Sequence, residues 1–413
     1  MVMFLVVEDE QGYQLHQEWQ PCSSSVLKLK TFEIGKPTQN QLGLRFKLST
    51  ISKLVTILFL KVKTTNYLNK FMTDTIQGRY PWKPEIRKDL IRDDDPFYIA
   101  GNEGLAEVIS LGDGIDSNQW KIGDWVVMGK PQLGTWQSHT NLNEEDLIKI
   151  PKSNNLTEVQ AATMSVNMST AYRMIKDYLP QSYAANPGTF FELNQISILI
   201  TRLYSYWALS TDTWIIQNGA NSSVGQYVLQ MCKAWNLGCI GLIRDRPNVE
   251  DLKRYLTGLG TENKTKIMTY EELMNQPKVT QSSEKMRIPL GLNCISGNEE
   301  TLGMMKWMSN GARLITYGGM SMKPLVVPTS LLIFKDLKLE GFMLTNWRLK
   351  ASRKEYKEML LDLLKLVDQG HLVQHEHATI VDLDSQNAEQ ILHDTVSQSM
   401  TGKAGKKFLF RFV

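Results

Sequence analysis

A glycine- and serine-rich turn, Gly219–Gly225, precedes two arginines, Arg244 and Arg246, and these residue types together could bind a phosphorylated ligand. Small residues at the start of a helix leave backbone N–H groups free to bind phosphate. Arginine adds forked donors that suit the same group. In dinucleotide sites, arginine at the tip of the second strand accommodates the 2′-phosphate of NADP, whereas NAD sites usually place a carboxylate there. The residues therefore predict an NADPH site.

A strand, a helix and a second strand must position these groups. An apolar run begins at Trp214 and leads into the turn, and Ile240–Ile243 leads to the arginines. Between them, apolar residues recur at helical spacing, namely Val224, Tyr227, Val228, Met231 and Trp235. The turn is not a full G-x-G-x-x-G, because Ala220 and Ser222 break the spacing. The arginines, however, lie about 20 residues on, where the ribose-reading residue of a dinucleotide fold belongs.

Size and charge limit the function classes. The chain has 413 residues, enough for two domains, with 46 basic and 43 acidic residues and a net charge of +3. This balance does not suggest nucleic acid or an anionic membrane as the main partner. Four cysteines lack metal-ligand spacing, so we expect reduced thiols, no zinc and no disulfide. They are Cys22, Cys232, Cys239 and Cys294.

Two apolar stretches could be mistaken for membrane spans. Leu54–Val62 is short, and Ile196–Leu209 is interrupted by Arg202 and falls below the about 20 residues that a span needs. The first residues, Met1–Glu10, turn acidic at once, which is not expected of a mitochondrial presequence. We therefore expect no membrane span, and we see no targeting segment.

Two patterns of elements follow one another along the chain. Tyr98–Pro151 reads as short strands with turns, typical of a compact β-rich domain. From Ser165 on, strands and helices alternate, which predicts a parallel sheet with ligands at its carboxyl edge. The later strands are expected at Leu290–Ile295, Leu314–Tyr317 and Leu339–Thr345, followed by a helix at Lys354–Leu366 and a basic tail at Lys403, Lys406 and Lys407.

Motifs spread over most of the chain point to one family. They occur in the order Ile76–Pro81, Gly101–Gly104, Gly134–Trp136, Ser165–Asn167, Ile216–Asn218, Arg244–Pro247, Thr316–Met320 and Ser330–Lys335. As a set they resemble the mitochondrial trans-2-enoyl-thioester reductases, a zinc-free branch of the medium-chain dehydrogenase/reductase superfamily. The absence of zinc also agrees with Gly101-Asn102-Glu103, since zinc-dependent relatives have histidine where this chain has asparagine, a poor zinc ligand.

The resemblance implies an α/β protein with a GroES-like β-rich catalytic domain and a Rossmann-type doubly wound NADPH-binding domain. We expect the first at residues 1–170 and 346–413 and the second at residues 171–345. The family forms homodimers and reduces 2-enoyl groups on acyl carrier protein or coenzyme A in mitochondrial fatty acid synthesis. A mitochondrial location is thus implied by resemblance alone.

Tyr80 is the expected catalytic residue. Reduction of a 2-enoyl thioester by hydride delivery to Cβ needs a proton at Cα, and a phenol holds its proton at neutral pH yet can release it to a carbanion-like centre. A loop tyrosine is more often a packing or surface residue, but Ile76–Pro81 matches the catalytic segment of the family. The resemblance also assigns contacts with NADPH to Asn167, Asn221, Ser222, Ser223, Val224, Arg244, Asp245, Arg246, Tyr317, Gly318, Gly319, Met320, Phe342, Met343, Leu344, Thr345 and Lys406.

Three features depart from the family pattern. Asn69–Met72 replaces the familiar strand end before Tyr80 and is preceded by the unfamiliar run Gln41–Tyr67, within an unusual segment 41–75. Met343 stands where the family usually has tryptophan. Residues 189–211 are inserted before the strand that leads to the turn, an unusual apolar insertion in a compact domain. We hypothesise that both segments are translated intron or gene-model error, an idea that peptides spanning Phe190–Leu209 in the mature protein would contradict.

Two other functions stay open at this point. A quinone reductase of the same superfamily would share the cofactor site without needing Tyr80. A catalytically impaired NADPH-binding or protein-interaction paralogue would fit the altered segment before Tyr80.

Overall fold

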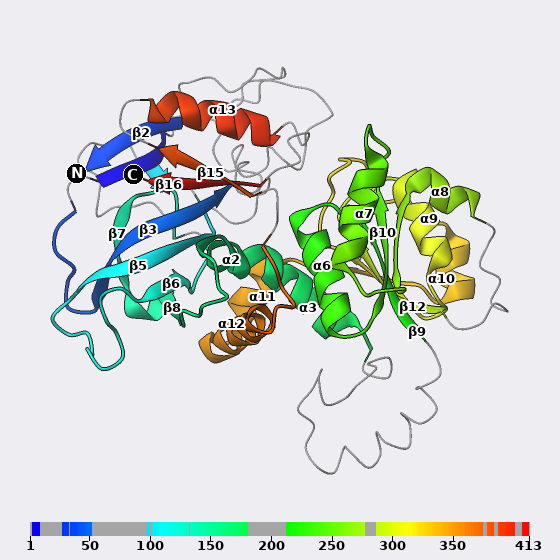
Figure 1. The fold of residues 1–413 in the computed structure, drawn as a ribbon, viewed down its shortest axis with the longest axis horizontal. Coiled ribbons are helices and arrows are strands. Elements are labelled where there is room, and N and C mark those ends of the chain that lie inside the picture. Colours follow the sequence, from blue (N-terminus) through cyan, green and yellow to red (C-terminus); the bar gives the residue numbers. More distant parts are fainter. Residues whose placement is uncertain are drawn as a thin grey trace, which may run out of the picture. The chain divides into compact units, whose positions relative to one another are not determined.

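The chain folds into two compact units that are interleaved along the sequence (Figure 1). The computed structural model describes residues 2–8, 27–32, 34–51, 97–99, 101–131, 133–180, 212–276, 286–374, 378–383, 387–400 and 407–412. The first unit comprises Met1–Val166, Thr345–Asp368 and Gln374–Val413, and the second comprises Asn167–Leu344 and Gln369–Val373. Tyr80, Lys406 and segment 189–211 lie outside the described residues.

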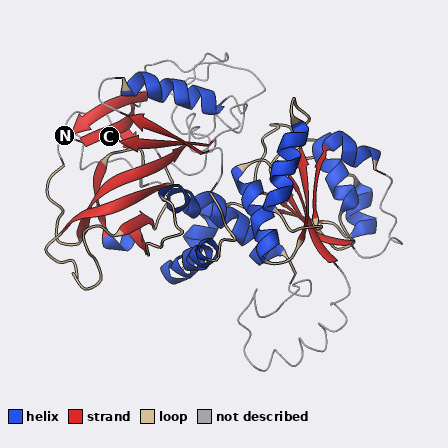
Figure 2. Cartoon of the chain, in the orientation of Figure 1, coloured by secondary structure: helices blue, strands red, loops and turns tan. Residues whose placement is uncertain are grey.

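The first unit is built mainly of antiparallel strands (Figure 2). Its larger sheet has the order β15-β16-β3-β5-β6-β8, with β7 also paired to β3, and a smaller sheet has the order β2-β1-β4. The strands are β1 (Val2–Glu8), β2 (Leu27–Phe32), β3 (Gln41–Ile51), β4 (Phe97–Ile99), β5 (Gly104–Leu111), β6 (Trp125–Met128), β7 (His139–Asn143), β8 (Leu147–Ile150), β15 (Ala378–Leu383) and β16 (Lys407–Phe412). The helices are η2 (Glu144–Asp146), α2 (Glu158–Thr163), α11 (Leu344–Lys350), α12 (Arg353–Asp368) and α13 (Ala388–Met400). The helix expected at Lys354–Leu366 is confirmed as α12.

Strand β3 corrects one interpretation of the sequence. Gln41–Ile51 opens the run that we regarded as foreign, yet its 11 residues pair with β5, β7 and β16. Leu42, Leu44 and Phe46 alternate into the core of the unit at 0–1% exposure. Apolar residues at every second position are the signal of a strand with one buried face. We overlooked this signal because the run lacks the motif of the family. For these residues the hypothesis of a translated intron is wrong, because they form the strand that joins the sheet.

Replacing Leu44 with alanine is expected to lower the free energy of unfolding by about 2–5 kcal/mol, the usual cost of emptying a buried leucine site. Arg45→Ala is the matched control on the opposite face of β3, where the Arg45 side chain is 52% exposed and pairs with Glu107 at 3.0 Å. That change should cost less than about 1 kcal/mol. Denaturant unfolding measures both, and equal costs would show that β3 is not a core strand.

The second unit is a Rossmann-type fold. Its sheet has the order β11-β10-β9-β12-β13-β14, and every pair is parallel. Numbered from β9, this is the order 3-2-1-4-5-6 of dinucleotide-binding sheets. The strands are β9 (Asp212–Asn218), β10 (Gly238–Ile243), β11 (Thr265–Thr269), β12 (Met286–Asn293), β13 (Arg313–Thr316) and β14 (Lys338–Gly341). The helices are α3 (Ser169–Tyr178), α6 (Ser223–Ala234), α7 (Val249–Leu259), α8 (Tyr270–Asn275), α9 (Glu299–Trp307) and α10 (Thr329–Lys335).

Helices cover both faces of this sheet, α6 and α7 on one side and α8, α9 and α10 on the other (Figure 1). Consequently β10 is buried along its whole length, as expected for a parallel strand between two helical layers. The strand expected at Leu339–Thr345 is too long by four residues, since β14 ends at Gly341 and helix α11 begins at Leu344.

Candidate functional site

The glycine- and serine-rich turn joins β9 to α6 at the carboxyl edge of the parallel sheet. Gly219 has φ +62°, and a Cβ there would lie 2.6 Å from the Cys294 Sγ. A Cβ on Gly225 would lie 2.6 Å from the Gly219 carbonyl oxygen. Ser222 is the N-cap of α6, and its hydroxyl accepts a hydrogen bond from the Gly225 amide at 3.1 Å. Glycine is thus required at both positions, and the turn presents the start of a twelve-residue helix.

The residues predicted to contact phosphate in this turn are only partly buried. Asn221, Ser222, Ser223 and Val224 all keep intermediate exposure. The turn is tied down by two backbone bonds, from the Ala220 amide to the Leu242 carbonyl at 3.1 Å and from the Ser222 amide to the Gly219 carbonyl at 2.8 Å. A fixed, accessible helix N-terminus is a ready anion site.

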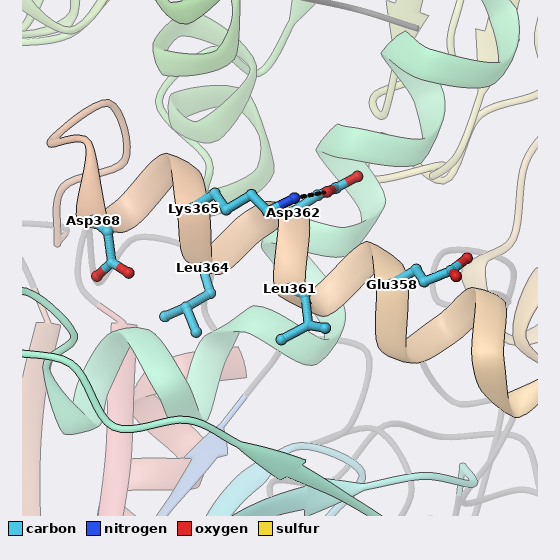
Figure 3. A pocket seen from close by; sticks show the side chains of 6 residues that line it. All are labelled: Glu358, Leu361, Asp362, Leu364, Lys365 and Asp368. Atoms are coloured by element: carbon cyan, nitrogen blue, oxygen red, sulfur yellow. Dashed lines mark hydrogen bonds and ion pairs between the residues drawn. The ribbon is translucent and has the colours of Figure 1, made fainter. Parts of the chain in front are cut away.

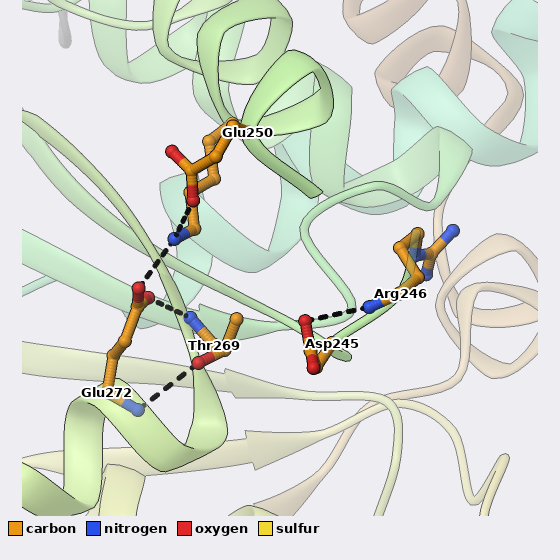
Figure 4. A network of polar contacts seen from close by, with 6 residues as sticks. Asp245, Arg246, Glu250, Thr269 and Glu272 are labelled. Carbon is orange, nitrogen blue, oxygen red and sulfur yellow. Dashed lines mark hydrogen bonds and ion pairs between the residues drawn. The ribbon is translucent and has the colours of Figure 1, made fainter. Parts of the chain in front are cut away.

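The predicted arginines follow directly after β10, which ends at Ile243. Between them, Asp245 turns its carboxylate onto the Arg246 amide at 2.9 Å (Figure 4). Among the described residues, no carboxylate lies within ion-pair distance of the Arg244 or Arg246 guanidinium. Partial burial and the neighbouring charge of Arg244 lower the pKa of Arg246 from its usual value. Two close cations with no carboxylate partner in the described part of the chain favour binding of an anion.

The nearby carboxylates are engaged elsewhere. Lys253 lies between Glu250 and Glu272, with Nζ–O distances of 2.7 Å and 2.6 Å. Glu272 also closes a capping box with Thr269 at the start of α8 (Figure 4). The bonds with Lys253 lower the pKa of Glu272, which keeps it ionised. Both of these carboxylates are therefore paired with Lys253.

A buried tyrosine hydroxyl that follows strand β13 lies beside the turn. Tyr317 begins the loop after β13, and its hydroxyl is buried beside Cys294 and Ser222 without a well-aligned hydrogen bond to a described residue. Burial raises its pKa well above the usual value. Gly318 and Gly319 follow, and the Met320 side chain is 44% exposed. A buried hydroxyl at the helix N-cap, with no aligned partner among the described residues, is available to bond to a ligand.

The remaining predicted residues lie in several places. Asn167 is 9% exposed in a π-helix, Met164–Met168, and is the first residue of the second unit. Phe342 donates its amide to the Thr316 carbonyl at 3.0 Å, and its ring meets Tyr178 edge-on at 6.0 Å. Met343 lies between β14 and α11, Leu344 and Thr345 are the first two residues of α11, and Thr345 also opens the next segment of the first unit. The structure thus gathers the turn, the arginine pair and the Tyr317 loop at one sheet edge.

Comparisons with known proteins assign this chain to a family. No family model matches the sequence. A Schizosaccharomyces pombe protein named mitochondrial enoyl-[acyl-carrier-protein] reductase is 32% identical over 391 residues, which cover 93% of this chain and 90% of the relative. The chain belongs to the mitochondrial enoyl-[acyl-carrier-protein] reductase family. This assignment confirms the resemblance inferred from the sequence.

Solved structures of enoyl thioester reductases share the fold of this family member. A complex of Etr1p with NADP and crotonyl-CoA matches with a TM-score of 0.76 at 27% identity, covering 99% of both chains. A mitochondrial 2-enoyl thioester reductase Etr1p/Etr2p heterodimer from Candida tropicalis matches with a TM-score of 0.75 at 28% identity, again over 99% of both chains. The expected fold class, a β-rich GroES-like part plus a Rossmann-type part, is confirmed.

Two buried asparagines that brace this site were not predicted from the sequence. The Asn218 Nδ2 donates to the Asn293 Oδ1 at 2.8 Å, and the Asn293 Nδ2 donates to the Thr316 hydroxyl at 3.1 Å. These bonds link the ends of β9, β12 and β13, and both asparagines are fully buried. The signal in the sequence is an asparagine closing each of two apolar runs, a position where a buried polar side chain needs partners.

Tyr270 was also missed. It is the first residue of α8, and its phenol oxygen lies beside the backbone of Gly219. Burial raises its pKa, and Cys294 and Arg244 lie close enough to influence it. Tyr270 follows Gly219 by 51 positions in the sequence, so only the folded sheet brings the two residues together.

Other kinds of site receive no support from the described part of the reductase. No cluster of three or more His, Cys, Asp or Glu there could hold a metal ion. None of the helices described is long and apolar enough to cross a membrane. A hollow of about 250 Å³ runs along α12, lined by Glu358, Leu361, Asp362, Leu364, Lys365 and Asp368 (Figure 3). Its lining comes from one helix and contains none of the predicted site residues.

Proposed function

We propose that this protein uses NADPH to reduce trans-2-enoyl thioesters, carried on acyl carrier protein or coenzyme A, to saturated acyl thioesters in the mitochondrion. The family assignment supports the reaction and, through the names of the relatives, the location. The observation that carries the cofactor is the arginine pair, Arg244 and Arg246, placed without a carboxylate partner among the described residues beside an accessible helix N-terminus.

The residues present fit NADPH. The amides and hydroxyls at the start of α6 would hold the pyrophosphate, and the two guanidiniums would hold the 2′-phosphate. The buried Tyr317 hydroxyl, which lacks an aligned partner among the described residues, would gain one. We further propose that Asn167, Phe342–Thr345 and Lys406 complete the cofactor contacts, as the resemblance implies. When bound, NADPH supplies the hydride for the reaction.

The protein must also supply a proton to Cα of the substrate. We propose Tyr80 as the donor, although it lies outside the described residues. A phenol keeps its proton at neutral pH and releases it to a carbanion-like centre. In domain terms, we propose that the first unit is the catalytic domain and that the second unit is the nucleotide-binding domain.

Substrate choice tests the proposal against its alternatives. We expect the purified protein to oxidise NADPH with a 2-enoyl-CoA such as crotonyl-CoA, and to do so far more slowly with a quinone. The consumption of NADPH is followed optically with each acceptor. Turnover with quinone alone would instead support a quinone reductase. Binding of NADPH without turnover of either acceptor would support a non-catalytic paralogue.

We also propose that the protein forms a homodimer through the β14 edge of the second unit. Strand β14 closes the parallel sheet, and no described strand pairs with its outer edge. Beside it in sequence, α10 exposes Leu332, Ile333 and Phe334 by 40%, 67% and 81%. An open edge and a contiguous apolar patch are typical of an interaction surface. A second copy would present the same edge and the same patch, which suits a two-fold interface.

Helix α10 is held so that it keeps this patch exposed. The Lys335 ammonium, at its last residue, donates to the carbonyls of Met305, Lys306 and Met308 at the end of α9. Burial lowers the pKa of Lys335, but the three carbonyls at a helix C-terminus suit a cation. The patch is therefore a fixed feature of the second unit.

Replacing Phe334 with glutamate is expected to convert the dimer to monomer at micromolar concentration. The interface would lose two phenyl groups, each worth about 1.5–3 kcal/mol of burial, so the dissociation constant should rise by about two to four orders of magnitude. Light scattering coupled to size exclusion measures the mass. Ile122→Glu, at a residue that is 69% exposed in the first unit, is the matched control and should leave the dimer intact. A wild-type monomer, or a dimer that survives the Phe334 change, would contradict the proposed interface.

A further inference from the structure

A short π-helix, Met164–Met168, connects α2 to α3 at the boundary between the two units. Its wider turn departs from the usual helical pattern, and such turns are rare and often lie at functional sites. The Val166 amide donates to the Glu103 Oε1 at 2.7 Å, a bond outside the helix. Asn167, the proposed contact with NADPH, is the next residue along the chain.

Glu103 is itself held on several sides. It is 1% exposed, and its Oε2 lies 3.4 Å from the Lys407 Nζ, whose side chain is 8% exposed. Its backbone carbonyl accepts the Thr135 hydroxyl at 3.0 Å. Two residues earlier, Gly101 has φ +90°, and its carbonyl accepts the Thr135 amide at 3.0 Å. The carboxylate therefore projects from a loop with little freedom to move.

This arrangement joins three distant segments through one buried carboxylate: the loop before β5, the π-helix and β16. A buried ion pair is often no more stabilising than apolar side chains of similar volume, so stability alone is weak grounds for placing one here. A buried ion pair can, however, fix one geometry among several. The geometry fixed here is that of the backbone immediately before Asn167.

We propose that Glu103 is a positioning residue for NADPH: by accepting the Val166 amide, it holds the π-helix in the shape that presents Asn167. The inference rests on the proposed function, because it needs NADPH as the ligand of Asn167. Lys407 neutralises the carboxylate, which allows a strong acceptor to be buried at this point.

Two double variants isolate the hydrogen bond from the charge. Glu103→Gln with Lys407→Met keeps a carbonyl acceptor for Val166 in a neutral site. Glu103→Met with Lys407→Met is equally neutral and removes the acceptor, with a flexible side chain filling the space. We expect the first to bind NADPH nearly as tightly as the wild type and the second about tenfold more weakly, the size of one lost hydrogen bond. Titration by nicotinamide fluorescence gives the dissociation constants without any turnover.

The effect of Asn167→Ala on the two double variants separates positioning of Asn167 from a merely structural role of Glu103. In an Asn167→Ala background the two double variants should bind NADPH equally, because the residue they position is gone. Equal affinity of the two variants while Asn167 is still present would overturn the inference and leave the proposed function intact. Failure of the wild type to bind NADPH would overturn both.

Amide exchange keeps the inference testable should the variant that carries Glu103→Met fail to fold. In the wild type, the Val166 amide should exchange slowly, as a hydrogen-bonded and partly buried amide does. Exchange at the rate of an exposed loop amide would overturn the inference, because Glu103 would then not hold this amide in solution.

Discussion

Tyr80→Phe is expected to lower the rate of 2-enoyl-thioester reduction by about two to four orders of magnitude, the usual worth of a positioned proton donor. Phenylalanine keeps the ring and removes only the transferable proton, so the substrate should still fit. Binding of NADPH should be unchanged, because the turn and the arginine pair belong to the second unit. The measurements are kcat with crotonyl-CoA and the dissociation constant of NADPH.

Tyr255→Phe is the matched control for that change. Tyr255 lies on α7, and its hydroxyl bonds to the Gln226 side chain at 3.0 Å. Loss of one partly buried hydrogen bond should reduce stability by about 1 kcal/mol and leave kcat unaltered. If Tyr80→Phe keeps the wild-type kcat, the proton comes from another group and the role assigned to Tyr80 is wrong.

The cofactor half of the protein could be predicted from the sequence because its signals are local. The apolar run, the turn, the helical spacing and the arginines lie close together in the chain, and each is set by backbone geometry or by the chemistry of phosphate. The sheet order around β9 follows from a right-handed βαβ topology that few alternatives satisfy. What remained hidden was the source of the free arginine charge. The pairing of the neighbouring carboxylates was also hidden: Lys253 engages Glu250 and Glu272, which lie on separate helices.

Where the sequence misled us, long-range pairing decided the outcome. Leu339–Thr345 was expected to form one strand, but β13 offers partners only as far as Gly341, and the chain then turns into α11. Gln41–Ile51 was dismissed because it lacked the family pattern, although its alternation is that of a strand with one buried face. Tyr270 and Asn293 support the turn only through the folded sheet, so no local pattern could have placed them there.

Arg244→Ala combined with Arg246→Ala is expected to weaken binding of NADPH by about two to four orders of magnitude, since each lost charge-assisted bond to phosphate costs about 1.5–3 kcal/mol. Binding of NADH, which lacks the 2′-phosphate, should change little. The dissociation constants of both nucleotides measure the selectivity. Arg254→Ala is the matched control, because Arg254 is a nearby arginine on α7 whose side chain is 80% exposed and pairs with Asp251.

Comparing NADPH with NADH separates a specific loss of 2′-phosphate binding from a general folding defect. A folding defect, or a displaced turn, would weaken NADPH and NADH alike, and that result would remove Arg244 and Arg246 from the site. A loss confined to NADPH, with binding that added salt weakens more in the wild type than in the double variant, identifies the interaction as one between the arginines and a phosphate. Burial and, second to it, the neighbouring charge of Arg244 lower the pKa of Arg246. A bound phosphate also relieves the repulsion between the two guanidiniums, and this gain is lost when either one is removed, so each single variant should lose at least half of the total.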